Sequence, residues 1–416
     1  MTEILSKCKI KEFDLLLAEK KNVLALGPES AGNFSVYING KVYYCSDFGD
    51  LLEEERFDVY KKALFELIDR NNLIPDIIRV DLHPAYKTSK LGEELALKFN
   101  CRLERVQHHI AHVYSAVFDQ FAGYESTKDL PILRKQGEYE STNTLRIRRK
   151  HGDMTLPTKF LGIACDGTGL GLDGKIWGGE VFQYQISNIK NKLTRIGHLE
   201  NQLLCGGDAA IKEPARMLLS ILLNIKKPAE VWPIFSAFYT EQQFDTLVKM
   251  REQKFNSLET SSAGRVLDAV SVLLGFCGNE RKYKHEPIDL LEKNSTQPFE
   301  LEPVITEEQR NKETEEQWSN GAMKQYVLNT SYLFEWLLEN LDKDKGRLAA
   351  TVQKYIIEGL IEIAKRTDPN LPIYFSGGMA NNRIMSQIAM NNGLIMAENI
   401  DRGDNALSLG QLTLFL

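Results

Sequence analysis

The alternation of apolar and polar residues predicts one group of elements near the N-terminus. Residues 22–49 show an apolar strand, a loop of Gly, Ser and Asn, and two further strands joined at Asn39-Gly40. Asn-Gly favours a tight hairpin, because both residues tolerate a positive φ. A helical pattern over 57–72 and an apolar strand over 76–82 follow.

The same group is predicted a second time in the middle of the chain. Residues 159–186 contain an apolar strand ending at Asp166, a Gly-rich loop, a turn at Asp173-Gly174 and an alternating strand. A long, mostly helical region follows, and a late strand over 371–378 ends in two glycines. A repeated βββαβ plan predicts an α/β protein of two lobes with a central cleft.

Two polar segments divide these patterns and suggest domain boundaries. Residues 119–158 and 293–320 contain few large apolar residues; we expect a surface excursion in the first and a loop with a short helix in the second. The predicted divisions are an N-terminal extension over 1–21, a first lobe over 22–157 with the excursion at 119–157, and a second lobe over 158–416. The C-terminal helix is expected to pack back toward the first lobe.

Composition and charge exclude several classes of protein. Of 416 residues, 43% are hydrophobic and 26% charged, and 51 basic against 57 acidic residues give a net charge of −6. This balance offers no broad basic surface for nucleic acid, and no apolar run reaches the ~18 residues that a membrane span needs. The first 20 residues lack the apolar core of a secretion signal, and the six cysteines form no CxxC pair. We therefore expect a cytoplasmic chain without a membrane or nucleic-acid partner.

The densest group of chemically active residues is VQHHIAH, residues 106–112. His108 and His112 are four positions apart, so on a helix both rings project from one face and can bind one metal ion. Two ordinary histidines at a helix start explain the pattern equally well. His109 lies about 100° around the helix from His108 and is a candidate to face the substrate.

A second candidate is CDGTGLGLDG, residues 165–174. Its glycines imitate a dinucleotide fingerprint, but a strand follows them where that fingerprint requires a helix, which excludes a Rossmann site. A Gly-rich hairpin can still bind phosphate through its backbone N–H groups. Asp166 at the end of a buried strand is either a metal ligand or a turn cap.

Three weaker motifs follow along the chain. GGDAAIKEPARM begins with Gly206-Gly207, YFSGGMANN places Gly377-Gly378 after a strand, and RGDNALSLGQ contains Asp404, a candidate oxygen ligand. Each also fits an ordinary strand-to-helix turn or helix start. Nucleophile-elbow, HExxH and Walker motifs are absent from the sequence.

Together these strings resemble the C-terminal carbamoyltransferase half of the HypF hydrogenase-maturation family, and more distantly the O-carbamoyltransferases of nodulation and antibiotic pathways. The resemblance runs from about residue 22 to the C-terminus and rests most heavily on DGTG with WGGE and on GGDAAI with EPARM. It implies an actin-like, Hsp70-like ATPase fold with two RNase H-like lobes.

The resemblance also implies a set of site residues. One divalent ion, iron or zinc, would be held by His108, His112, Asp166 and Asp404, with His109 and Lys212 as candidate catalytic residues. ATP or carbamoyl-adenylate would lie against residues from several loops, namely Gly167, Thr168, Gly169, Gly206, Gly207, Asp208, Asp268, Gly377, Gly378 and Asn382. The carbamoyl group would pass to a protein thiol or to a small molecule.

This chain departs from the family pattern at several positions. The lysine of the family's GxELKN is replaced by Ala31, its YEGQA by YKHEP at 283–287, and a late-helix histidine by Gln353. The family's acylphosphatase, zinc-finger and adenylate-forming modules have no counterpart here, so we expect a separate carbamoyl-adenylate-forming enzyme as a partner. Two alternatives stay open: a non-catalytic scaffold that binds nucleotide and metal, and a relative of the tRNA threonylcarbamoyl transferases.

Overall fold

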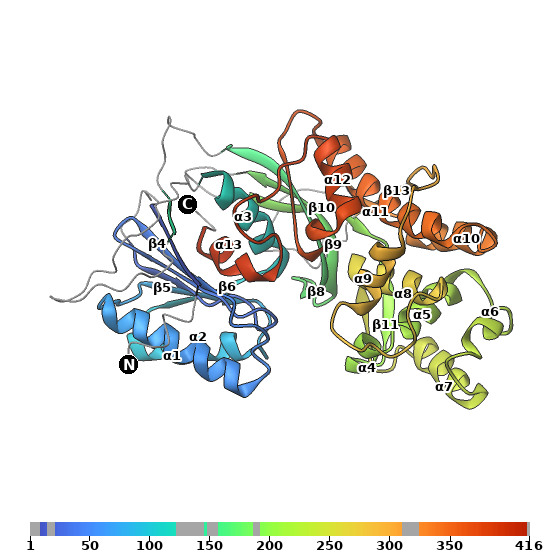
Figure 1. Ribbon diagram of the computed structural model, residues 1–416, viewed down its shortest axis with the longest axis horizontal. Coiled ribbons are helices and arrows are strands. Elements are labelled where there is room, and N and C mark those ends of the chain that lie inside the picture. Colours follow the sequence, from blue (N-terminus) through green and yellow to red (C-terminus); the bar gives the residue numbers. More distant parts are fainter. Residues whose placement is uncertain are drawn as a thin grey trace. The chain divides into compact units, whose positions relative to one another are not determined.

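The computed structural model describes residues 9–14, 21–121, 145–147, 157–185, 192–309 and 324–413 (Figure 1). The chain forms two compact units. The first unit comprises residues 1–157 and 396–416, and the second comprises residues 158–395. Each unit is built around its own β-sheet.

The sheet of the first unit contains the predicted βββαβ group. Strands β2 (Val23–Ala25), β3 (Phe34–Ile38) and β4 (Lys41–Ser46) are antiparallel, with Asn39 and Gly40 at positive φ in the turn between β3 and β4. Strands β5 (Ile77–Asp81) and β6 (Arg102–Val106) then run parallel to β2. The sheet order is β6-β5-β2-β3-β4-β1-β7, where β1 is Lys9–Asp14 and β7 is Leu145–Ile147.

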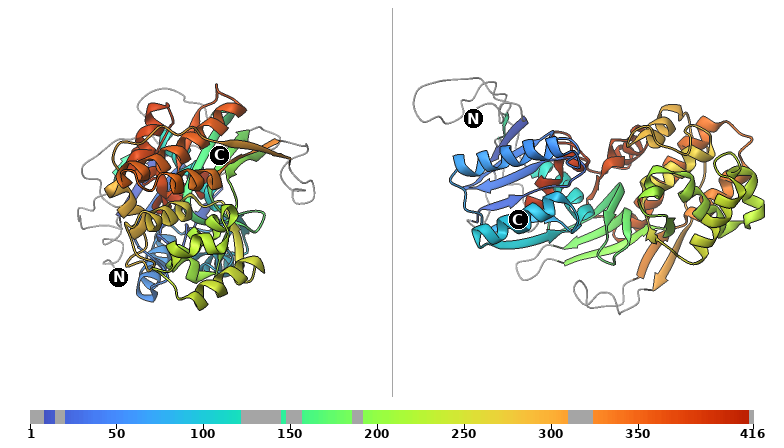
Figure 2. Two further views of the ribbon diagram at one scale, coloured as in Figure 1. Left: turned by 90° about the vertical axis from the view of Figure 1, so that its right-hand side faces the viewer. Right: turned by 90° about the horizontal axis from the view of Figure 1, so that it is seen from below.

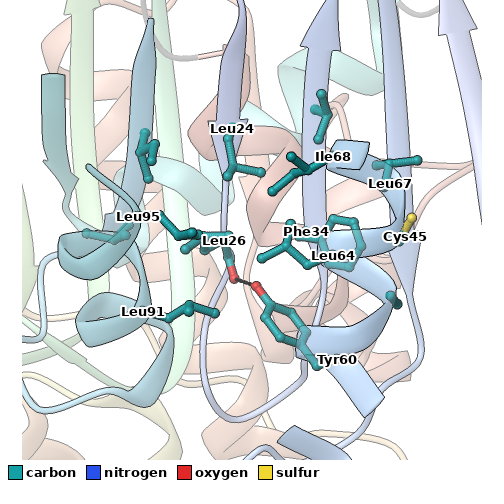
Figure 3. Close-up of a cluster of buried hydrophobic side chains, with 14 of the residues drawn as sticks. Leu24, Leu26, Phe34, Cys45, Tyr60, Leu64, Leu67, Ile68, Leu91 and Leu95 are labelled. Carbon is teal, nitrogen blue, oxygen red and sulfur yellow. Dashed lines mark hydrogen bonds between the residues drawn. The ribbon is translucent and has the colours of Figure 1, made fainter. Parts of the chain in front are cut away.

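Alternation along the strands gives this sheet two apolar faces, each covered by helices (Figures 1 and 2). Leu24 packs under α1 (Glu54–Arg70) and α2 (Lys87–Phe99), in a core where the Tyr60 hydroxyl donates to the Leu26 carbonyl at 2.7 Å (Figure 3). The neighbours of Leu24 on the strand face the opposite way. They pack with Phe118 of α3 (His108–Phe121) and Leu409 of α13 (Leu407–Thr413).

The second unit repeats the same order of strands. Strands β8 (Lys159–Leu170), β9 (Ile176–Gln185) and β10 (Lys192–Leu199) are antiparallel, and β15 (Ile373–Ser376) runs parallel to β8. The sheet also contains β11 (Gln202–Cys205), β12 (Ser257–Thr260), β13 (Ile305–Gln309) and β14 (Lys324–Leu328). The predicted α/β class and the doubled βββαβ plan are confirmed.

The helices of the second unit fall between β11 and the end of the unit. They are α4 (Asp208–Lys212), α5 (Ala215–Ile225), α6 (Pro228–Phe235), α7 (Glu241–Glu252), α8 (Ala263–Leu273), α9 (Glu286–Asn294), α10 (Thr330–Glu339), α11 (Lys345–Thr367), the 3-10 turn η3 (Gly378–Asn381) and α12 (Arg383–Asn391). The longest, α11, is buried along one side, where Leu360 and Ile363 are fully enclosed. Within the described residues, no helix is both long and apolar enough to cross a bilayer.

The structure differs from the predicted boundaries at both ends of the chain. Residues 396–416 group with the first unit, although the predicted second lobe ran to residue 416. The reason is packing: Leu409 and Leu412 complete the first core, and Arg79 Nη1 donates to the carbonyls of Gln411 and Leu412 at 3.0 and 2.9 Å. Strand β1 lies inside the predicted extension over 1–21, where Phe13 is fully buried.

The two predicted polar segments are only partly described. Of the excursion at 119–157, residues 122–144 and 148–156 lie outside the described residues, and β7 lies between them. In the second segment, residues 305–309 form the strand β13, and the expected short helix stays a prediction, because residues 310–320 lie outside the description.

One glycine controls how closely α13 approaches α3. A Cβ on Gly410 would collide with the carbonyl oxygen of Ala111 and lie 2.9 Å from the Ser115 nitrogen. Gly410→Ala should therefore lower the free energy of unfolding by about 1–3 kcal/mol, although alanine is the better helix former. The measurement is a denaturant titration beside Gly278→Ala, where a Cβ would have no neighbour within 4 Å. Equal stability of both variants and the wild type would contradict this packing.

Candidate functional site

The start of α3 brings two histidines onto one buried face. Strand β6 ends at Val106, and the side chain of Gln107 accepts a hydrogen bond from the Ile110 nitrogen at 2.9 Å. His108 and His112 then lie one turn apart, with exposed fractions of 2% and 0%. Their Nε2 atoms are 3.2 Å apart. The predicted helical pair is thus present, and both rings are directed at one point.

Asp404 reaches the same point from the loop before α13. It opens the short 3-10 turn η4 (Asp404–Ala406), and its Oδ1 lies 3.2 Å from His108 Nε2 and 3.2 Å from His112 Nε2. The amide of Asn33 fixes this loop, since it donates to the Asp404 carbonyl at 2.8 Å and accepts from the Ser408 nitrogen at 2.9 Å. Two nitrogens and one oxygen therefore form a triangle with sides of 3.2 Å.

Asp81, which the sequence analysis did not assign to the site, lies behind His108. It ends β5 with 1% of its surface exposed, and its Oδ2 is 2.8 Å from His108 Nδ1. Its other oxygen accepts from the His83 nitrogen at 2.9 Å. A carboxylate at Nδ1 keeps the ring proton there, so that the Nε2 lone pair faces the triangle. The signal in the sequence was an aspartate at a strand end, in DLHPAY.

The triangle has the chemistry and the dimensions of a metal site. Lone pairs and a carboxylate oxygen repel one another at this distance unless a cation or a proton lies among them. Metal–ligand bonds of about 2.0–2.2 Å place neighbouring ligand atoms about 3.0–3.5 Å apart. Burial alone would raise the pKa of Asp404, but the neighbouring imidazoles of His108 and His112 outweigh burial and hold that pKa well below its usual range, so the carboxylate stays ionised. Two imidazoles and a carboxylate suit zinc or iron.

The fourth predicted ligand, Asp166, belongs to the second unit, where two glycines lie close to it. Its Oδ1 accepts from the Gly378 nitrogen at 3.3 Å, and a Cβ on Gly378 would lie 2.9 Å from that oxygen. Gly377 has a φ of 98°, and a Cβ there would collide with the Cys165 carbonyl. The Gly-Gly pair thus lets the chain pass directly over the end of β8. That Asp166 binds metal stays a prediction.

A buried ion pair holds the hairpin that follows Asp166. Glu180 of the WGGE motif is fully buried and accepts from Arg195 Nε at 2.5 Å, from the Gly178 nitrogen at 3.1 Å and from the Ser261 hydroxyl. The Arg195 guanidinium lies 4.3 Å from the centre of the Trp177 ring. Burial would raise the pKa of Glu180, but Arg195 outweighs it and the pKa is lowered. The motif therefore acts as a support, which the sequence alone did not reveal.

The predicted nucleotide loop lies against the N-terminus of α8. Ser262 caps this helix, accepting from the Arg265 nitrogen at 3.0 Å and donating to the Gly167 carbonyl. A Cβ on Gly264 would lie 2.8 Å from the Gly167 Cα, so helix and loop are in direct contact. Thr168 and Gly169 continue the same stretch of β8, where Gly169 pairs with Trp177.

Asp268 lies one turn further along α8 and is 1% exposed. Its Oδ2 forms ion pairs with Arg265 Nη1 at 3.0 Å and with Arg281 Nη2. Asp268 was predicted near a ribose; within the described residues its Oδ1 has no hydrogen-bond partner and can accept from a ligand.

The Gly206-Gly207 turn joins β11 to α4. Both glycines have positive φ, 107° and 55°. A Cβ on Gly206 would lie 2.7 Å from Nη1 of Arg216, whose Nε forms an ion pair with Glu213 at 2.9 Å. Asp208 and Lys212, the first and last residues of α4, are exposed. Their roles in nucleotide binding and catalysis stay predictions.

Asn382 has no polar side-chain atom left for a nucleotide. Its Oδ1 caps α12, and its Nδ2 donates to Gln353 Oε1 at 2.7 Å and to Glu292 Oε2 at 3.1 Å. Gln353 in turn donates to the Ser295 hydroxyl at 2.7 Å. The residue that replaces the family's histidine is thus part of a satisfied buried network that orients the turn after Gly377-Gly378.

His109, the other catalytic candidate, is fully buried in the first unit. Gln107 Nε2 lies 2.9 Å from its Nδ1. The Gln107 oxygen already accepts from Ile110, so its amide nitrogen is the donor and the neutral His109 ring carries its proton on Nε2.

Comparisons with known proteins agree with the motifs. A family model described as a carbamoyltransferase Kae1-like domain, second subdomain, matches residues 162–411, and a HypF Kae1-like domain model matches residues 18–119. The probable carbamoyltransferase HypF of Methanocaldococcus jannaschii is 34% identical over 406 residues, covering 94% of this chain and 46% of that protein. A HypF homologue of Cupriavidus necator is 28% identical over 253 residues, covering 61% and 55%. The chain spans about half the length of these relatives.

Solved structures share the fold. HypF from T. kodakarensis superposes with a TM-score of 0.75 at 25% identity, covering 96% of this chain and 48% of that one. A full-length HypF in a phosphate- and nucleotide-bound form also gives 0.75, at 21% identity, covering 97% and 56%.

Loss of the Asp81 carboxylate should weaken metal binding without removing a ligand. In Asp81→Ala the proton on His108 is no longer held at Nδ1, and we expect the affinity for Zn(II) or Co(II) to fall by about 10–100-fold. Isothermal titration gives the affinity, and a melting curve checks the fold. Asp69→Ala, an exposed aspartate on α1, is the control. Unchanged affinity in a folded Asp81→Ala protein would remove Asp81 from the site.

Proposed function

Because the chain belongs to the HypF carbamoyltransferase family, we propose that it transfers a carbamoyl group from carbamoyl-adenylate to a protein thiol or a small-molecule acceptor. The match of the family model over residues 162–411 supports the assignment. The observation that carries the proposal is the buried triangle of His108, His112 and Asp404. Its two Nε2 atoms and the Oδ1 atom of Asp404 each lie 3.2 Å from the other two.

We infer that this triangle holds one divalent ion, iron or zinc, and that Asp166 supplies a fourth ligand from the second unit. When bound, such an ion acts as a Lewis acid that polarises the carbamoyl oxygen or neutralises a phosphate. The residues of the chain do the rest: Asp81 orients the His108 ring, and Asn33 fixes the loop that carries Asp404.

His109 is the candidate for proton transfer in the first unit. Because its Nδ1 accepts from Gln107, the neutral ring donates a proton from Nε2 more readily than it accepts one there. We therefore assign it the part of a hydrogen-bond donor that stabilises negative charge on the leaving adenylate, rather than that of a base.

The second unit supplies the nucleotide site in this proposal. Gly167 to Gly169, Gly206-Gly207 and Gly377-Gly378 present backbone N–H groups without side chains in the way. One structurally similar HypF was determined with phosphate and nucleotide bound. Asp208 and Lys212, exposed on α4, are candidates to contact the nucleotide and the transferred group.

The test is a transfer assay with two donors. Purified protein loaded with Zn(II) or Fe(II) receives either preformed carbamoyl-adenylate, or carbamoyl phosphate with ATP. The acceptors are a peptide ending in cysteine and a small thiol. We expect AMP release and a carbamoylated acceptor, detected by mass spectrometry, with preformed carbamoyl-adenylate. If carbamoyl phosphate with ATP requires an added adenylate-forming enzyme, the partner prediction also holds.

His108→Ala should lower this transfer by at least about 100-fold, because a ligand and the partner of Asp81 are lost together. Glu94→Ala, an exposed change on α2, serves as the control. Metal content is measured for every variant. Full transfer by metal-free His108→Ala would refute the role of the triangle. Nucleotide binding without transfer to any acceptor would favour the scaffold alternative.

A further inference from the structure

The second unit contains a buried charge cluster whose two arginines have no part in the proposed transfer reaction. Arg265, Asp268 and Arg281 form it: both guanidinium groups contact the same carboxylate oxygen, Asp268 Oδ2. The side chains of the two arginines are 8% and 9% exposed, and that of Asp268 is 1% exposed. Two buried positive charges therefore share one negative charge.

The cluster lacks hydrogen-bond partners that another buried ion pair of the same unit has. The carboxylate of Glu180 meets one arginine and accepts three further hydrogen bonds, two from backbone nitrogens and one from Ser261. In the Arg265 cluster, by contrast, Nε of each arginine and Oδ1 of Asp268 have no hydrogen-bond partner among the described residues. Buried charged groups are costly without partners, so such a cluster is typical of a site that a ligand completes.

Position relates the cluster to the loops already described. A Cβ on Gly167 would lie 3.4 Å from Arg265 Nη2, so this guanidinium faces the Gly-rich loop after Asp166. The backbone nitrogen of Arg281 donates a hydrogen bond of 3.3 Å to the carbonyl of Lys212, at the end of α4. Arg281 also lies just before YKHEP at 283–287, the segment that departs from the family pattern.

The geometry points to an anion-binding subsite in which Arg265 and Arg281 together bind one phosphate or phosphoryl group. Guanidinium groups present parallel N–H donors that match the oxygens of a tetrahedral anion. One bound anion would supply both the missing negative charge and acceptors for the two Nε–H groups. Consistent with uncompensated charge, burial and then the like charge of Arg265 lower the pKa of Arg281. The site does not depend on carbamoyl transfer, so it can be tested separately.

Arg281→Met tests the site, because it removes charge and donors while keeping the length of the side chain. We expect inorganic phosphate at constant ionic strength to raise the melting temperature of the wild type, and this rise to be lost in the variant. Without phosphate the variant should melt no lower than the wild type, since Arg265 and Asp268 remain as a balanced pair. Arg366→Met, an exposed arginine paired with Glu362 on α11, is the matched control and should respond like the wild type.

A second variant and a second ligand comparison complete the test. Arg281→Lys keeps the charge without the planar donors, and should bind phosphate at least about tenfold more weakly than the wild type even if Arg281→Met fails to fold. Calorimetry then compares AMP with adenosine. Weaker binding of AMP but not adenosine identifies a nucleotide phosphate as the anion, and weaker binding of inorganic phosphate alone identifies a free anion. An equal phosphate response in wild type and Arg281 variants, or equal losses for AMP and adenosine, would overturn the subsite.

Discussion

The contact of α13 with α3 is the constraint on which the first unit's site depends. His108 and His112 are fixed by α3, whereas Asp404 comes from a chain segment almost 300 residues later, and only close helix packing brings its carboxylate within 3.2 Å of both rings. Gly410 allows that approach, because any side chain there would meet the Ala111 carbonyl. Arg79 anchors the far end of α13 through two of its last carbonyls. The apolar contacts of Leu409 and Leu412 with the sheet supply the driving force.

The second unit repeats the strand plan of the first but places glycines after strands β11 and β15, whereas the first unit places histidines after β6. Its glycines lie where strand ends, a helix start and a turn meet, so backbone rather than side chain lines the region around Asp166 and Gly167. Around this region lie satisfied networks, such as Glu180 with Arg195 and Asn382 with Gln353. If these loops bind the nucleotide as proposed, rigid supports of this kind would keep the site preformed and lower the entropic cost of binding. The arginine pair at Asp268 differs from these two networks, because Nε of each arginine and Oδ1 of Asp268 have no hydrogen-bond partner among the described residues.

Local patterns in the sequence predicted many of the elements and site residues described above. The Asn39-Gly40 turn, the two βββαβ groups and the i, i+4 histidines are set by short-range geometry, and the structure contains all three. The family assignment from DGTG, WGGE and GGDAAI is likewise confirmed. What escaped prediction depends on contacts between distant segments. Asp81 meets His108 across 27 positions, and Glu180 meets Ser261 across 81. The packing of the C-terminal helix toward the first lobe was expected, but the boundary at residue 396 depends on which core has room for the segment before α13, which no local pattern encodes.

The central claim is that His108, His112 and Asp404 bind one metal ion, and X-ray absorption at the metal edge tests it most directly. The protein is loaded with one equivalent of Zn(II) or Fe(II), and the extended fine structure is recorded for wild type and His112→Gln. The account predicts nitrogen and oxygen ligands at about 2.0–2.2 Å and outer-shell scattering from two imidazoles, reduced to one in the variant. A first shell of sulfur at about 2.3 Å, or imidazole scattering unchanged by His112→Gln, would contradict it.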